Sequence, residues 1–141
     1  MKEKEENFQK LYIEFQMLSS TIKQLEKQNE VLEQQLLELL TTRQSLEDIK
    51  KVKQGAEILV PVSAGIYLKA ELKETNNFIV NVGSNVALSK NLESTKQVID
   101  DQIGELREMQ ENIAAEFENS TAKASKIEEE LKQIASTLQE E

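Results

Sequence analysis

The sequence predicts an α+β chain in which two long helices form an antiparallel coiled-coil hairpin, with two β-hairpins inserted between the helices. The only proline and three of the four glycines fall between residues 55 and 83. Glu, Lys, Gln and Leu dominate on both sides of this window, whereas Val, Ile, Phe and Tyr are frequent within it. We therefore predict a coiled-coil helix over residues 1–53, a β segment over residues 55–90 and a second coiled-coil helix over residues 91–141.

The first helical segment contains a heptad pattern, in which apolar positions recur at alternating steps of three and four residues. Only Asn29 and Arg43 interrupt its apolar character. A single Asn at such a position commonly fixes the register of a coiled coil, and we assign that role to Asn29. This first seam consists of Phe8, Leu11, Phe15, Leu18, Ile22, Leu25, Asn29, Leu32, Leu36, Leu39, Arg43 and Leu46.

The last helical segment contains a second seam with the same alternation. It is weaker, because Ser120 and Gln110 are polar, Ala124 is small, and Gly104 loosens the helix by ~1 kcal/mol relative to Ala. Both helices adjoin the same short middle segment, so we expect them to fold back as antiparallel neighbours. The second seam consists of Ile99, Ile103, Leu106, Gln110, Ile113, Phe117, Ser120, Ala124, Ile127, Leu131, Ile134 and Leu138.

The middle segment alternates apolar and polar residues with a period of two, which is typical of half-buried strands. Short turns at residues 63–65 and 83–85 separate neighbouring strands, so that the segment forms two β-hairpins. The expected strands are residues 58–62, 66–72, 78–82 and 86–89.

The β segment lacks the means to cover itself. Pro61 has no backbone N–H to donate, which favours a place at a sheet edge. Isolated hairpins are marginal in water, and open edges with uncovered apolar faces invite pairing with other chains. We therefore predict an assembly module that other subunits complete, with a small closed sheet in a monomer as the alternative. Its assembly residues are Ile58, Val60, Pro61, Val62, Ile66, Leu68, Leu72, Phe78, Val80, Val82, Val86 and Leu88.

Composition excludes many other functions. The chain has no His and no Cys, so it cannot build an imidazole or thiolate metal site or the usual nucleophile–base couples. A net charge of -9 disfavours nucleic acid. No apolar run is long enough to span a bilayer, and the first residues are charged where a signal peptide is apolar. We expect a cytoplasmic protein that is not an enzyme and has no cofactor, no metal, and no nucleic-acid or membrane partner.

Two stretches of the β segment resemble a known family. Residues 59–73 read LVPVSAGIYLKAELK and residues 80–92 read VNVGSNVALSKNL. These two segments resemble sequences of the prefoldin family, specifically its archaeal α-class subunits. The order of elements, a helix, two hairpins and a second helix, extends the resemblance over essentially the whole chain. One departure is Ser63, where α subunits usually have Gly.

The resemblance implies a subunit of a hexameric chaperone. Two copies of this chain and four β-class subunits would form a β-barrel platform that carries six coiled coils. Non-native polypeptides would be held between the coiled coils, without ATP, and delivered to a group II chaperonin.

Such holding requires exposed apolar surface, which the free end of the coiled coil could supply by local unwinding. Apolar side chains that adapt to varied partners, Met included, suit this role. The alternative is that the seam members among them are ordinary core residues. The candidate client-binding residues are Phe8, Leu11, Tyr12, Ile13, Phe15, Met17, Leu18, Ile127, Leu131, Ile134 and Leu138.

Two other functions fit parts of the sequence. A homo-oligomeric, filament-forming prefoldin relative would use the same β segment without a β-class partner. A structural coiled-coil adaptor would need only the seams, although the β insertion argues against it.

Overall fold

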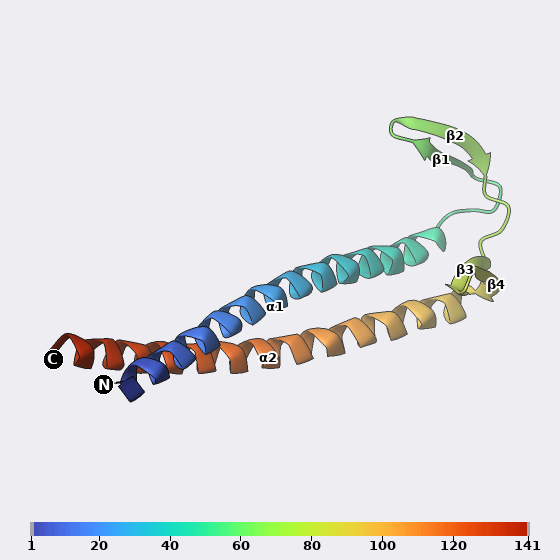
Figure 1. The fold of residues 1–141 in the computed structure, drawn as a ribbon. Coiled ribbons are helices and arrows are strands. Elements are labelled where there is room, and N and C mark those ends of the chain that lie inside the picture. The colour runs from blue at the N-terminus through green and yellow to red at the C-terminus, as the bar shows by residue number, and fades with distance from the viewer. Residues whose placement is uncertain (1, 141) are drawn as a thin grey trace. The chain divides into compact units, whose positions relative to one another are not determined.

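A computed structural model describes residues 2–140, so that Met1 and Glu141, the terminal residues of the two predicted helices, lie outside the described part. The α+β fold, with two β-hairpins between two long helices, is confirmed (Figure 1). The elements are α1 (Lys2–Ile49), β1 (Glu57–Ser63), β2 (Ile66–Glu71), β3 (Asn77–Gly83), β4 (Val86–Asn91) and α2 (Leu92–Glu140).

The chain forms two compact units, which we describe separately. The outer unit comprises Met1–Gln35 and Leu106–Glu141, and the inner unit comprises Leu36–Glu105. The outer unit therefore holds the first part of α1 and the last part of α2. The inner unit holds the remaining helix segments and both β-hairpins.

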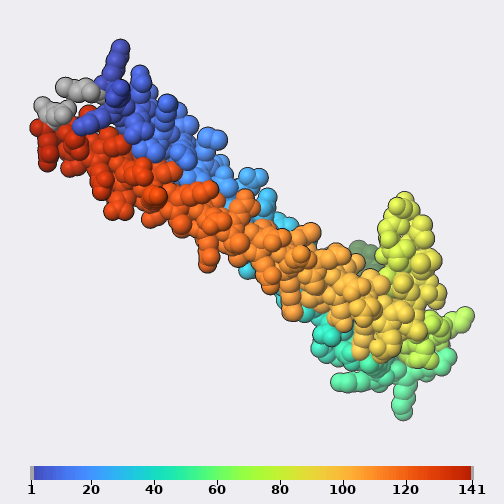
Figure 2. All heavy atoms as spheres, turned by 90° about the horizontal axis from the view of Figure 1, so that it is seen from below, coloured from blue at the N-terminus to red at the C-terminus, as the bar shows by residue number. Residues whose placement is uncertain are grey.

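In the outer unit the two helix segments pack along each other through the predicted seams (Figure 2). Every seam position of this unit is buried or half-buried. Leu25, Ala124 and Ile127 are buried, and so is Ser120. Burial at steps of three and four residues is what a coiled coil requires, because only these positions return to the same side of a helix.

Asn29 is half-buried in this seam. Its Nδ2 donates a hydrogen bond to Glu33 Oε1 at 3.3 Å, which lies on the same helix. The contact gives one N–H of the amide a partner within α1, and the role of Asn29 in fixing register stays a prediction.

Local signals mark the C-terminal end of α1 and the N-terminal start of α2. α1 stops at Ile49, before residue 53, because the chain turns there: Lys51 N donates to Asp48 O at 3.0 Å, and Gly55 has a φ of 86°. At the start of α2, Asn91 is the N-cap, and its Oδ1 accepts a hydrogen bond from Ser94 N at 2.8 Å.

Within the described residues the strands form two separate two-stranded antiparallel sheets, not one closed sheet. β1 pairs with β2, and β3 pairs with β4. In the second hairpin Ser84 and Asn85 have φ values of 50° and 59°, which are the left-handed values that a type I′ turn requires. Each hairpin therefore forms from local pairing alone.

We predict that Leu25→Ala lowers the free energy of unfolding by about 2–3 kcal/mol, because it empties a seam position that is only 5% exposed. Urea unfolding followed by far-ultraviolet circular dichroism measures the change. Val31→Ala is the matched control on the same helix, since Val31 is exposed, and it should change stability by less than about 0.5 kcal/mol. Equal losses for both variants would contradict the seam assignment.

Candidate functional site

The first β-hairpin presents a continuous apolar face. Ile58 lies opposite Ala70, and Val60 lies opposite Leu68. Because side chains alternate across a strand, these four share one face of the sheet. The opposite face is more polar, with Glu57 opposite Glu71 and Leu59 opposite Lys69.

The second hairpin repeats this arrangement. Val80 lies opposite Leu88, and Phe78 lies on the same face of the hairpin as these two residues. On the other face, Ile79 lies opposite Ser89 and is 84% exposed. The strand pairing therefore places Ile58, Val60 and Leu68 on one face of the first hairpin, and Phe78, Val80 and Leu88 on one face of the second. Pro61 lies opposite Tyr67 on the other face of the first hairpin.

The predicted assembly residues remain largely uncovered in the single chain. Ile58, Leu72, Phe78 and Val80 are half-buried, and none of the set is buried. Leu72 continues the contact between β1 and β2, since its N donates to Ala56 O at 2.9 Å and its O accepts from Gly55 N at 2.7 Å. The exposed members are Val60, Pro61, Val62, Ile66, Leu68, Val82, Val86 and Leu88.

The predicted client-binding residues fall into two groups in the outer unit. The seam group is buried or half-buried between the two helices, so it is accessible only if they separate. This group consists of Phe8, Leu11, Phe15, Leu18, Ile127, Leu131, Ile134 and Leu138.

The second group is exposed on α1 without any opening of the seam. Tyr12 is 49% exposed, Ile13 is 56% exposed and Met17 is 66% exposed. Ile13 and Met17 are four residues apart, so they lie side by side on one face of the helix. The ring of Tyr12 stacks on Phe8, with centroids 6.4 Å apart and an angle of 5° between the ring planes. This stack links the exposed group to the first residue of the seam.

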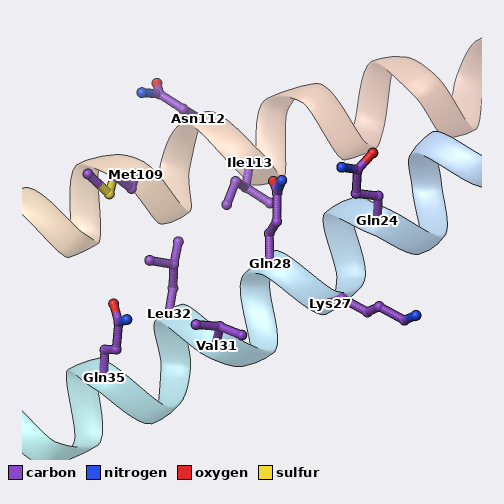
Figure 3. A pocket seen from close by; sticks show the side chains of 9 residues that line it. All are labelled: Gln24, Lys27, Gln28, Val31, Leu32, Gln35, Met109, Asn112 and Ile113. Atoms are coloured by element: carbon purple, nitrogen blue, oxygen red, sulfur yellow. The ribbon is translucent and has the colours of Figure 1, made fainter.

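The sequence reasoning missed an apolar groove of about 590 Å³ in the outer unit (Figure 3). Leu32 of α1 and Ile113 of α2 point into the space between the helices, and Val31 and Met109 extend the apolar surface. Amide side chains from Gln24, Gln28, Gln35 and Asn112 line it as well. Val31 and Met109 are apolar residues beside the seam, but the pattern along one helix does not show that they lie near each other.

Residues 2–140 contain no cluster of three or more side chains suited to hold a metal ion. Within the same range, neither helix is long and apolar enough to cross a membrane. The apolar features of the described residues are the two hairpin faces, the groove of the outer unit and the residues near the free end of α1.

Comparison with known proteins gives one consistent family. The model of prefoldin subunits matches residues 2–137. The prefoldin subunit alpha of Pyrococcus horikoshii is 29% identical, over 94% of this chain and 93% of its own length. That of Thermofilum pendens is 27% identical, over 88% of this chain and 96% of its own length. That of Thermococcus onnurineus is 36% identical, over 74% of this chain and 72% of its own length.

A solved structure has the same fold. It is the cryo-EM structure of filamentous PFD from Methanocaldococcus jannaschii, which superimposes with a TM-score of 0.74. The match covers 81% of this chain and 94% of that chain, at 19% sequence identity.

Proposed function

Because this chain belongs to the prefoldin family, in its α class, we propose that it is a subunit of a hexameric chaperone that holds non-native polypeptides without ATP. In this proposal two copies of the chain join four smaller β-class subunits in the cytoplasm. Clients bind near the free ends of the coiled coils and pass to a group II chaperonin. The observation that supports it most directly is the apolar surface that the single chain leaves exposed in both places.

The hairpin faces support the assembly part of the proposal. Each two-stranded sheet has unpaired edges, and Leu68 and Leu88 are about half exposed or more. A β-barrel built with strands from neighbouring subunits would pair these edges and bury these faces. The hairpins would then be the platform, and the helices would be left free to bind.

The exposed residues of α1 support the client-binding part. Tyr12, Ile13 and Met17 offer an aromatic ring, a branched chain and a flexible thioether without any rearrangement. The seam residues beneath them would add apolar surface when the helix ends separate, as fraying ends do. Clients of varied sequence could thus be held reversibly.

A filament of this chain alone is the second candidate. Its support is the solved structure of filamentous PFD from Methanocaldococcus jannaschii, which has the same fold. The open edges of the two hairpins suit stacking of identical chains as well as pairing with a β-class partner.

We predict that Leu88→Lys lowers the assembled fraction roughly tenfold or more. An unpaired charge in an apolar interface costs more than ~1.4 kcal/mol, which corresponds to a factor of ten. Size-exclusion chromatography with light scattering, on the complex purified with its partners, measures the fraction. Ile79→Lys is the matched control, because Ile79 lies on the opposite face of the hairpin. Equal assembly of both variants with the unaltered protein would contradict burial of the Leu88 face.

We predict that replacing Tyr12, Ile13 and Met17 together by Ser strongly reduces protection of an aggregating client while leaving the assembly intact. Light scattering of a denaturant-unfolded client, diluted into the complex, measures protection. The matched control replaces Val31 and Leu37 by Ser, since both are exposed apolar residues of the same helix away from its free end.

The complementary change removes residues 1–18 and 127–141, which hold both groups of candidate client-binding residues. The shortened protein should still assemble, because its hairpins are unaltered, but it should no longer protect the client. If protection by the shortened complex equals that of the full complex, the clients bind elsewhere.

A further inference from the structure

The inner unit contains two charged residues at seam positions, one on each helix. Arg43 belongs to the first seam, and Lys96 continues the second seam, because it lies three residues before Ile99 and four after Leu92. The side chain of Lys96 is only 16% exposed. A cation at such a position requires a partner, because burying an unpaired charge is costly.

Each of these cations forms an ion pair with an acidic residue of the other helix. Arg43 Nε lies 2.8 Å from Asp100 Oδ1, and Lys96 Nζ pairs with Glu47 Oε1. The acidic partner in each pair stands four residues from the cation of its own helix. Arg43 and Glu47 are four residues apart on α1, and Lys96 and Asp100 are four residues apart on α2. The two pairs are therefore reciprocal, and both obey the same antiparallel alignment.

An apolar seam alone discriminates poorly between alignments that differ by one heptad. If one helix slides by seven residues, seam positions again face seam positions, and most layers stay apolar. The charged residues do not repeat in this way. A slide in one direction makes Arg107, in place of Asp100, the neighbour of Arg43. The same slide places Lys96 opposite Gln54 instead of Glu47. A slide in the other direction leaves Arg43 opposite an acid, Glu93, but places Lys96 against Leu40, where it has no partner.

We infer that the Arg43–Asp100 and Lys96–Glu47 ion pairs determine the register of α1 against α2 in the inner unit. Either slide breaks at least one pair, and one slide brings two cations together. The half-exposed Arg43–Asp100 pair contributes little to stability, whereas the Lys96 side chain is largely covered and is costly to leave unpaired, so the effect of the two pairs lies in excluding wrong alignments. Because β1 follows α1 and β4 precedes α2, the register also sets the positions of the chain ends from which the hairpins continue.

Cysteine cross-linking of the full chain tests this inference directly, since the sequence has no Cys. Thr42→Cys with Gln102→Cys reports the observed register, because the two positions flank the seams at the same height. Ile49→Cys with Gln102→Cys reports the alignment shifted by one heptad. A short bis-maleimide reagent joins each pair, and mass spectrometry separates links within one chain from links between chains.

Charge reversal by Arg43→Glu with Lys96→Glu should move the cross-link from the first cysteine pair to the second. In the observed register both new carboxylates face acids, whereas in the shifted register Glu at position 43 faces Arg107. The matched control, Lys23→Glu with Lys123→Glu, makes the same change in net charge at exposed positions and should keep the cross-link on the first pair. An unaltered cross-linking pattern in the reversed variant overturns the inference.

Adding Glu47→Lys and Asp100→Lys to the reversed variant recreates both attractions with opposite signs. This exchanged variant should recover the cross-link between positions 42 and 102. The recovery decides the matter even if the reversed variant unfolds and loses both cross-links. Failure to recover the link would show that these residues do not act as charge pairs and would overturn the inference.

Discussion

The apolar seam between two antiparallel helix segments is the interaction on which the rest of the molecule depends. In the outer unit it accounts for the buried positions of α1 and α2, at steps of three and four residues. A helix that buries only this narrow stripe keeps its other sides free. Side chains such as Ile13 and Met17 can therefore remain exposed on a helix that is nevertheless well packed.

The two β-hairpins differ from the helix segments in how far their apolar residues are covered. Within the described residues each strand pairs with one neighbour only, and most apolar side chains of the hairpins stay exposed. The packed seam and the exposed hairpin faces therefore suit two different roles. The helix segments of the outer unit pack against each other, whereas the hairpins leave apolar surface that, in our proposal, other subunits cover.

Most of the fold could be predicted because its signals are local and periodic. The seam positions follow from counting apolar residues, and the hairpins follow from alternation around short turns. The end of α1 could not be predicted as well, because Lys50 to Lys53 are compatible with a helix. The chain leaves the helix there because Gly55 takes a positive φ and joins Leu72 beside the first hairpin.

The ion pairs and the groove could not be predicted from the sequence, because their prediction requires knowing which residues of the two helices face each other. Arg43 appeared in the sequence only as an interruption of the seam, and Asp100 became its partner once the register was known. Val31 and Met109 lie outside the heptad positions, and they meet in one groove only when α1 and α2 are placed side by side. The residue pattern along one helix holds no information about such contacts with the other helix.

Native mass spectrometry of the complex, purified from its own cells through a small tag on this chain, tests the central claim most directly. The claim is that partner chains complete the exposed hairpin faces. A mass equal to two copies of this chain plus four copies of a smaller subunit is the predicted result. A ladder of multiples of this chain alone would contradict the hetero-hexamer and favour the filament.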